Sequence, residues 1–518
     1  MRRSLTAALV VLSMAGSVLL VPGSPASAHP TVVDPLADVT DPALARATNA
    51  LDGTAAIAEA PPARAKTSDA PAADEAPTLA LRDLFLALPR LDATERRAAQ
   101  GLLARPTDGS RDEYDDGYTV PAKRACGRRI CIHWVGRTKD APPNRRWVSR
   151  SLRVMKNVWA EEVGQLGYRR PVTDGRRGGN AKFDVYLKDV GSEGFYGYCV
   201  PEHRKPGHRW VASGYCVLDD DFARSQFDAR PRKSLRVTAA HEFFHAIQFG
   251  YDYAEDGWLM EATATWVEER VADGADDNRR YLEYGQVHRP QRPLDRYQQT
   301  GFGHYGNWAF FEYLSQRYGV DIVRRIWENA AGPPRNYSTR AVKRSLPGGT
   351  TFPEVFRAYA AANTTPALSY SEGAAWPAAP MARTYTLKRT SRSAHGTLRV
   401  DHMAARHVLV RPAKAMRGTG WTLRLSVDGP AVTQGAAAYA IVHRPSGTVK
   451  RWPIALDRDG RGGIEVRFGS RRVKRVTLTL ANASTGFDCW RQQLVFSCQG
   501  RPRGDNRSFT YAATAVRR

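Results

Sequence analysis

The sequence lacks long apolar runs over almost all of its 518 residues. Only the stretch Leu5–Val21 approaches the ~18–20 apolar residues that a membrane-spanning helix requires, and it falls short of them. It follows Arg2-Arg3 and precedes Ala26-Ser27-Ala28, an arrangement typical of a secretory signal peptide. We therefore predict a signal peptide over residues 1–28 and a secreted chain with no membrane span. An N-terminal membrane anchor is the alternative, which the shortness of the apolar stretch disfavours.

Cysteine is also scarce. The chain has six cysteines, and no two of them form the Cys-x-x-Cys pair of many structural zinc sites. They occur as three close couples: Cys126 with Cys131, Cys199 with Cys216, and Cys489 with Cys498. An even number in an exported chain predicts disulfide bonds, for which many pairings are formally open. Pairing within each couple is the simplest, because short loops close most readily.

Acidic residues are few relative to basic ones. The 52 Asp and Glu stand against 76 Lys and Arg, which gives a formal net charge of +24. Such a charge favours acidic partners such as cell-wall polymers, anionic membranes or nucleic acid. The sequence contains no zinc finger or other nucleic-acid module, so we expect no specific nucleic-acid binding. Electrostatic association with acidic cell-wall polymers is one interpretation of the charge, and an arginine-rich genome composition is the other.

Aromatic residues are missing between residues 29 and 80, a stretch rich in Ala, Pro, Asp and Thr that is typical of a linker. Leu81 to Arg105 is different, because its apolar residues follow the spacing of an amphipathic helix interrupted at Pro89. This order of segments predicts an inhibitory propeptide over residues 29–114, so that the chain is a zymogen. An ordinary N-terminal helix docked on the following domain is the alternative. The region contains no cysteine, which excludes latency through a cysteine switch.

The most informative motif is His241-Glu242-Phe243-Phe244-His245, which is followed by Glu261 in a second apolar segment. The pattern predicts one helix from Ser234, as its N-cap, to Gly250, and another from Trp258 to Val271. Residues four apart project from one face of a helix, so His241 and His245 can bind one Zn²⁺ together. Glu261 would complete the three protein ligands of a catalytic zinc site. A lone helical histidine is usually structural, but the second helix with its glutamate favours zinc.

The pentad with a glutamate on the next helix resembles the gluzincin metallopeptidases. The stretch Trp258-Leu259-Met260-Glu261-Ala262-Thr263-Ala264 is similar to a segment of the aminopeptidase N-like branch. The wider resemblance covers about residues 115–370 and looks most like secreted bacterial metallopeptidases of that clan. It implies zinc ligands at His241, His245 and Glu261 and a catalytic base at Glu242.

Three positions depart from the family pattern. Thr265 stands where thermolysin-like members carry an acid, and Met260 and Ala262 replace the Asn and Gly that flank the glutamate in aminopeptidases. The aminopeptidase signature Gly-x-Met-x-Asn is also missing upstream. An endopeptidase is therefore favoured over an aminopeptidase.

The chemistry implied is metal-assisted hydrolysis, in which Glu242 takes a proton from zinc-activated water and delivers it to the leaving amine. Tyr305, beside His304, is our candidate donor to the developing oxyanion; the alternative is a packing aromatic before the helix Trp308–Tyr318. Asp219-Asp220-Asp221 and Thr265 are candidates for accepting the second N–H of the zinc histidines. The same acidic run is a weakly supported Ca²⁺ site, for which a solvated turn is the alternative.

Two domains are expected. Strands at Ile130–Val135 and Phe183–Leu187 and a helix at Trp147–Leu166 precede the zinc helices, which predicts an α+β fold with a zincin-like metallopeptidase domain over residues 115–375. From about Thr384 the pattern changes to a period of two, which predicts an all-β sandwich accessory domain over residues 380–518.

These features predict a secreted zinc-dependent metallopeptidase that acts on a protein or peptide substrate. One alternative is a catalytically inactive binding or adhesion protein on a zincin scaffold, which the intact set of four site residues disfavours. The other is a zinc amidase acting on a non-protein amide such as that of peptidoglycan, because its metal chemistry would be the same.

Overall fold

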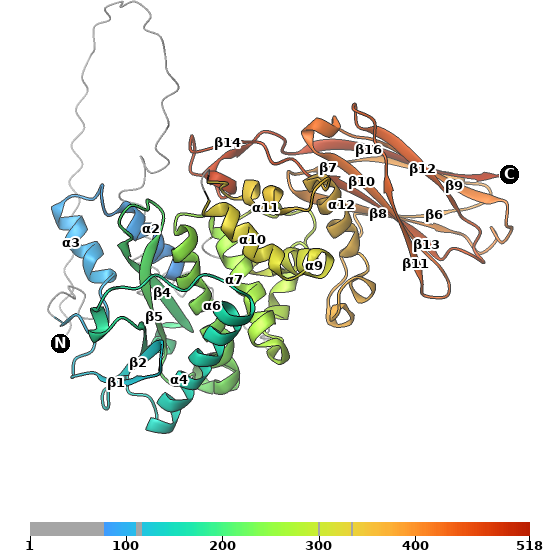
Figure 1. Cartoon of the computed structure of the whole chain (residues 1–518). Helices are drawn as coiled ribbons and strands as arrows, with labels where there is room; N and C mark the ends of the chain where they lie inside the picture. Colours follow the sequence, from blue (N-terminus) through green and yellow to red (C-terminus); the bar gives the residue numbers. More distant parts are fainter. Residues whose placement is uncertain (1–76, 110–116, 299–300, 333–334) are drawn as a thin grey trace, which may run out of the picture.

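The computed structural model describes residues 77–109, 117–298, 301–332 and 335–518. The predicted signal peptide and residues 29–76 and 110–114 of the predicted propeptide lie outside the described residues. The described chain forms a mixed α/β region followed by a β-rich region that runs to the C-terminus (Figure 1). No helix within the described ranges has the length and apolar character that crossing a bilayer requires.

A five-stranded sheet organises the first region, with the order β1-β2-β3-β5-β4. Strands β2, β3 and β5 run parallel, and the edge strands β1 and β4 are antiparallel to their neighbours. The strands are β1 Lys123–Cys126, β2 Ile130–Trp134, β3 Phe183–Lys188, β4 Gly197–Arg204 and β5 Ala212–Asp219. Both faces of the sheet are covered, so β3 and β5 are buried along their whole length and lack polar–apolar alternation.

Helices α4 and α6 cover one face of the sheet, where they pack on side chains such as Val185, Leu187 and Leu218. Helix α4 spans Arg145–Trp159 and continues into a π-helical turn at Ala160–Gln165. Helix α7 packs against α6. The helices after the sheet are α5 Arg224–Phe227, α6 Pro231–Asp252, α7 Gly257–Val271, α8 Gly303–Gly306, α9 Trp308–Tyr318, α10 Asp321–Ala330, α11 Thr339–Ser345 and α12 Phe352–Ala362.

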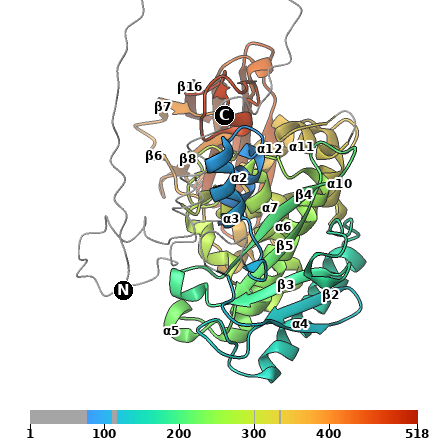
Figure 2. The same cartoon turned by 90° about the vertical axis from the view of Figure 1, so that its left-hand side faces the viewer.

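The other face of the sheet is covered by α2 (Pro77–Ala87) and α3 (Ala93–Leu102), and α2 lies beside β4 (Figure 2). Leu81 and Leu84 of α2 share a hydrophobic core with sheet residues such as Val200 and Val217. The helical part of the predicted propeptide, including its break after α2, is thus confirmed as structure. Its apolar face is integrated into the fold, because the sheet would otherwise expose that face to water.

Arg105, just beyond α3, adds a buried ionic anchor to the same segment. Its guanidinium donates to Glu202 Oε1 at 2.6 Å, to Asp184 Oδ2 at 2.7 Å and to Asp174 Oδ2 at 2.5 Å. Arg105 is only 1% exposed. Because Asp184 and Glu202 belong to β3 and β4, this network ties the N-terminal segment to two strands of the sheet.

The C-terminal region consists mainly of two antiparallel-rich sheets that share one hydrophobic core. The first has the order β11-β10-β13-β8-β6 and the second β12-β9-β16-β7. The strands are β6 Arg383–Leu387, β7 Ser393–Val400, β8 Ala404–Pro412, β9 Trp421–Asp428, β10 Ala436–His443, β11 Val449–Ile454, β12 Arg461–Arg467, β13 Arg475–Asn482 and β16 Arg507–Arg517, with the short pair β14 Phe487–Asp488 and β15 Arg501–Pro502. Alternating burial in β9, for example, accounts for the period of two seen in the sequence.

The two regions are joined by a continuous interface. Helix α12 packs on β10 and β13, and Met403 and Ala405 of the β-rich region belong to the core of the first region. His402 lies between two carboxylates at this interface: its Nε2 is 3.0 Å from Asp295 Oδ1, and its Nδ1 is 2.9 Å from Asp505 Oδ1. A ring with an acceptor on each nitrogen is best satisfied as the charged imidazolium.

This interface makes stability depend on pH. Burial lowers the pKa of His402, but the two carboxylates outweigh it and raise the pKa to about 9. Because the pKa in the unfolded chain is about 6.5, the stabilisation of about 3 kcal/mol is complete below that pH and is lost as the pH rises through 9. We expect thermal unfolding of the wild type and of His402→Gln to differ most at a pH of about 6 and to converge at about 9.5. A difference that does not change with pH would contradict this assignment.

Several boundaries differ from the sequence prediction. Ser234 is not the N-cap of α6, because the helix begins one turn earlier at Pro231, and Gly250 does not end it, because it continues to Asp252. The predicted helix Trp147–Leu166 is α4 with its π-helical turn. The three local disulfides are confirmed: Cys126–Cys131, Cys199–Cys216 and Cys489–Cys498.

Candidate metal centre

Helices α6 and α7 meet at the motif that the sequence singles out. Pro231 starts α6, because its fixed φ suits the first position of a helix and its missing N–H costs nothing there. His241 and His245 lie one turn apart, and their ring centroids are 4.8 Å apart. Both rings reach side chains of α7, so the pair forms one wall of a site between the two helices.

Glu261 of α7 lies between the two rings. Its Oε2 is 3.1 Å from His241 Nε2, and its Oε1 is 3.6 Å from His245 Nε2. Glu261 is fully buried, and its Oε1 has no hydrogen-bond partner among the described residues. The structure thus brings the three predicted ligands together, with ligand atoms that all lie within 4.8 Å of one another.

These separations fit a zinc ion. Tetrahedral bonds of about 2.0–2.1 Å place neighbouring ligand atoms roughly 3.3–3.4 Å apart. The measured separations of 3.1 and 3.6 Å lie on either side of that value. A cation here would also satisfy the unpartnered Oε1 of Glu261, and two imidazoles with one carboxylate form a donor set that catalytic zinc uses.

Each histidine is oriented through its other ring nitrogen. His241 Nδ1 is 2.7 Å from Glu268 Oε1, and His245 Nδ1 is 2.7 Å from Gln248 Oε1. Gln248 is fixed in turn, because its amide donates to the main-chain oxygen of Met260 at 2.9 Å. An acceptor at Nδ1 places a proton there. A metal bound at Nε2 would replace the proton that His241 otherwise donates to Glu261.

The sequence prediction of these outer partners was wrong. Thr265 donates its hydroxyl to the main-chain oxygen of Glu261 at 2.9 Å, and Asp219 accepts from the N–H of Gly191 at 2.6 Å. The sequence does place Glu268 on the same face of α7 as Glu261, two turns further along the helix. This placement could be interpreted only once the arrangement of the two helices was known.

The electrostatics of the site favour a cation between these side chains. Burial lowers the pKa of His241, but its bonds to Glu261 and Glu268 outweigh this, and the pKa lies well above its usual value. Burial raises the pKa of Glu261, but His245 and His241 outweigh this, and the pKa lies well below its usual value. Burial raises the pKa of Glu268 to about 7. Glu261 is therefore held as an anion in a buried position, with the protonated His241 or a bound cation as its positive partner.

Glu242 lines a cavity of about 50 Å³ together with His241, His245 and Tyr305. Its Oε2 accepts a hydrogen bond from the Thr78 hydroxyl of α2 at 2.9 Å, a contact that the sequence did not reveal. Burial raises the pKa of Glu242, and the two histidines offset part of that rise. A raised pKa suits a carboxylate that accepts and returns a proton near neutral pH.

Tyr305 lies at the site, as its predicted role requires. Its ring centroid is 5.9 Å from that of His241, and it also stacks on Tyr281 at 5.1 Å, so it packs as well as lining the cavity. His304 lies beside it, with ring centroids 4.4 Å apart and the two rings tilted by 44°. Burial lowers the pKa of His304 to about 4, so this ring is neutral at neutral pH.

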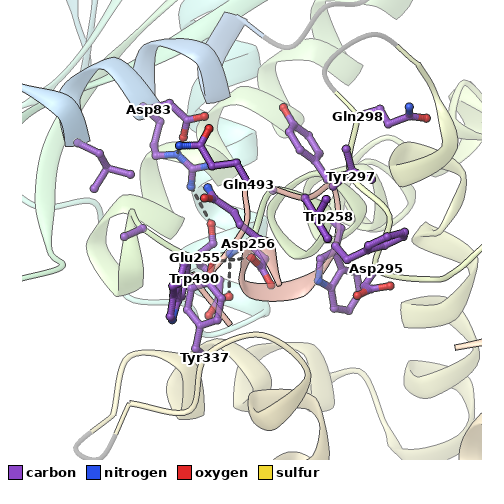
Figure 3. Close-up of a pocket in the computed structure, with 18 of the residues that line it drawn as sticks. Asp83, Glu255, Asp256, Trp258, Asp295, Tyr297, Gln298, Tyr337, Trp490 and Gln493 are labelled. Carbon is purple, nitrogen blue, oxygen red and sulfur yellow. Dashed lines mark hydrogen bonds and ion pairs between the residues drawn. The ribbon is translucent and has the colours of Figure 1, made fainter. Parts of the chain in front are cut away.

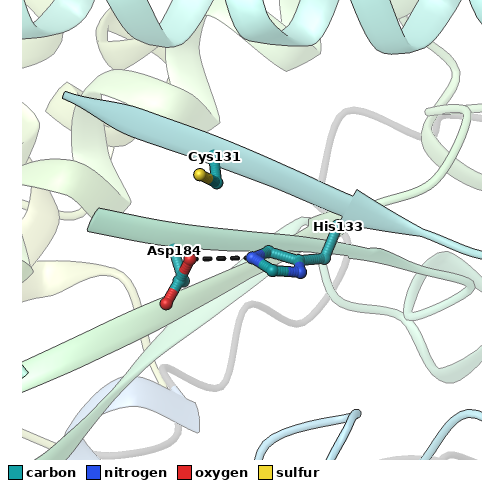
Figure 4. Close-up of side chains that lie close together, drawn as sticks. All are labelled: Cys131, His133 and Asp184. Atoms are coloured by element: carbon teal, nitrogen blue, oxygen red, sulfur yellow. Dashed lines mark hydrogen bonds and ion pairs between the residues drawn. The ribbon is translucent and has the colours of Figure 1, made fainter. Parts of the chain in front are cut away.

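Three other clusters among the described residues have metal-binding side chains, and one of them, Glu269, Asp273 and Glu372, is partly exposed. Cys131, His133 and Asp184 lie close together on neighbouring strands (Figure 4). The sulfur of Cys131 is bonded to Cys126 and is not a thiolate, so this cluster is a structural His133–Asp184 pair.

The acidic group Asp189, Asp219 and Asp220 is another of these clusters. Asp219 and Asp220 are buried, so the solvated turn considered from the sequence is wrong. Main-chain N–H groups occupy the oxygens of Asp219, among them that of Phe222. Ca²⁺ at this group stays a prediction.

Comparisons with known proteins match only part of the chain. A model of DUF6055, a family of unknown function, matches residues 208–367, which include helices α6 and α7. No curated protein sequence matches the chain. Among solved structures, the pre-peptidase C-terminal domain of collagenase from Bacillus anthracis aligns over 26% of this chain and 97% of that domain, at 9% identity and a TM-score of 0.16. A likeness at that score carries no argument about fold or function, so function rests on the site itself.

Proposed function

We propose that the protein is a secreted zinc-dependent metallopeptidase with a zincin-like fold. The observation that carries the proposal is the convergence of His241, His245 and Glu261 with Glu242 in one buried cavity. A structural metal site would not need the carboxylate of Glu242 beside its ligands. An inactive scaffold would have no physical need for all four residues together with the two supporting groups on the histidines.

Zinc bound by His241, His245 and Glu261 would supply Lewis acidity and lower the pKa of a bound water toward neutrality. Glu268 and Gln248 hold the two imidazoles in the tautomer that binds metal. Glu242 accepts the proton of the attacking water and returns it to the leaving amine. The phenol of Tyr305 lines the same cavity and is our candidate donor to the oxyanion.

The substrate class and partners are part of this proposal. We favour endopeptidase action on proteins or peptides, and the net charge of +24 favours retention near acidic cell-wall polymers. The β-rich C-terminal region would then be an accessory module. The three disulfides agree with an oxidising compartment.

Metal content and metal-dependent hydrolysis test the proposal together. We expect the purified full-length chain to hold about one zinc per chain. Removing it with 1,10-phenanthroline should abolish the hydrolysis of unfolded casein, and added zinc should restore it. A peptidoglycan fragment assayed in parallel separates a peptidase from an amidase. A chain that binds no zinc, or hydrolysis that survives chelation, would sink the proposal.

A further inference from the structure

The proposed active site is a narrow pocket in the folded chain, in which the side chain of His241 is 12% exposed. Glu242 is 8% exposed, His245 1% and Glu261 0%. The cavity of about 50 Å³ has room for a few waters but none for a peptide. Part of its lining is the first turn of α2, Pro77 and Thr78, which comes from a segment more than a hundred residues before the catalytic motif.

Thr78 forms hydrogen bonds with two groups that a peptide substrate would need, the carboxylate of Glu242 and the main-chain N–H of Cys199. Its hydroxyl donates to Glu242 Oε2 at 2.9 Å, where the attacking water must give up its proton. The same oxygen accepts from the main-chain N–H of Cys199 at 3.0 Å. Cys199 belongs to β4, an edge strand whose outward N–H groups can otherwise pair with an extended peptide.

Arg82, one helical turn after Thr78, anchors α2 in place. Its Nη1 donates to the main-chain oxygens of Glu255 at 2.7 Å and Tyr253 at 3.1 Å, at the turn between α6 and α7. A cavity of about 250 Å³ lies beside this anchor, between α2, the start of α7 and the C-terminal loop that carries Trp490 (Figure 3). This side of α2 therefore borders open space, while its apolar residues Leu79 and Leu81 pack on the rest of the fold.

We propose that the first turn of α2 is an autoinhibitory latch, with Thr78 as the residue that blocks the base and Arg82 as its anchor. The proposal rests on the proposed peptidase function, since it describes the regulation of that site. Displacement of the turn, by cleavage or by a partner, frees Glu242 and the N–H of Cys199 together. The chain as folded is then a latent form with a small open fraction.

Three full-length variants test the latch. Thr78→Val keeps the shape of the side chain and removes the hydroxyl, Thr78→Ser keeps the hydroxyl, and Arg82→Met removes the anchor without touching the site. For each we would measure casein hydrolysis, affinity for a peptidyl hydroxamate, and hydrogen exchange of the α2 amides. Thr78→Val and Arg82→Met should each raise the rate and the hydroxamate affinity about tenfold, because the lost bonds hold the closed state. Thr78→Ser should stay within about twofold of the wild type.

The outcomes separate the latch from the peptidase function. Hydroxamate affinity and α2 exchange that do not change in Thr78→Val and Arg82→Met would overturn the latch. A lower rate in Thr78→Val with no effect of Arg82→Met would also overturn it, because Thr78 would then be positioning Glu242. Raised hydroxamate affinity without casein hydrolysis in any variant would support the latch and contradict the peptidase function.

Discussion

Replacing Glu242 with glutamine is expected to lower casein hydrolysis by the zinc-loaded chain roughly 10²–10⁴-fold. Glutamine keeps the size and the hydrogen-bonding oxygen of the side chain but cannot take a proton. The ligands His241, His245 and Glu261 do not change, so zinc content should equal that of the wild type. The measurement is initial rate and zinc stoichiometry on the same samples, in the wild-type and Thr78→Val backgrounds. If α2 closes the site, the Thr78→Val background should give the higher initial rate and therefore the larger measurable decrease.

Glu162→Gln is the matched control for this experiment. Glu162 is also a fully buried glutamate, its carboxylate has no hydrogen-bond partner among the described residues, and burial raises its pKa well above the usual value. The raised pKa favours the protonated carboxyl, which glutamine resembles in size and shape. We expect its activity to stay within about twofold of the wild type. Equal loss in both variants would mean that Glu242 acts through the structure and not as the base.

The largest effect on stability is expected from Arg105→Met, at about 3–5 kcal/mol of unfolding free energy. The substitution keeps most of the side-chain volume but leaves Asp174, Asp184 and Glu202 without their shared cation. Asp184 and Glu202 keep only His133 and Arg177, and Asp174 loses its cation, so these buried carboxylates become strongly unfavourable as anions. The loss should appear in urea unfolding at neutral pH as a lower midpoint.

Two further measurements identify the cause of that loss. Arg105→Lys keeps the charge but cannot span the same carboxylates as a planar fork, so it should lose less than Arg105→Met but still be destabilised. Lowering the pH toward about 5 should reduce the loss in Arg105→Met, because the unpaired carboxylates then take up protons. A loss of equal size at both pH values would place the effect in packing instead of charge.

The sequence was sufficient where the controlling interactions are local. Residues four apart on a helix fixed the pairing of His241 with His245, short loops fixed the three disulfides, and alternation revealed most strands of the C-terminal region. Strand β5 was missed because Ser213 and Gly214 interrupt its apolar residues, whereas β3, equally buried, is apolar and aromatic enough to be found. The start of α6 was misplaced because Pro231 initiates the helix before Ser234 can cap it.

Contacts between distant segments could not be predicted in this way. Thr78 reaches Glu242 only because α2 docks on β4, and Glu268 reaches His241 only because α7 packs against α6. Threonine and glutamate are common residues, and neither residue type by itself indicates a contact with the proposed site. The predicted propeptide is the clearest case: its helical pattern was visible, but the side chain that contacts the base was not.

The disulfide between Cys199 and Cys216 has a consequence for where the protein can work. It cross-links directly opposed residues of β4 and β5, and the sulfur of Cys199 lies against the main-chain oxygen of Glu242. The disulfide thus holds β4, the edge strand that a substrate would use, close to Glu242, the proposed base. Reducing conditions would break this bond. A chain retained in a thiol-rich cytosol would lack this link between β4 and the helix that carries Glu242.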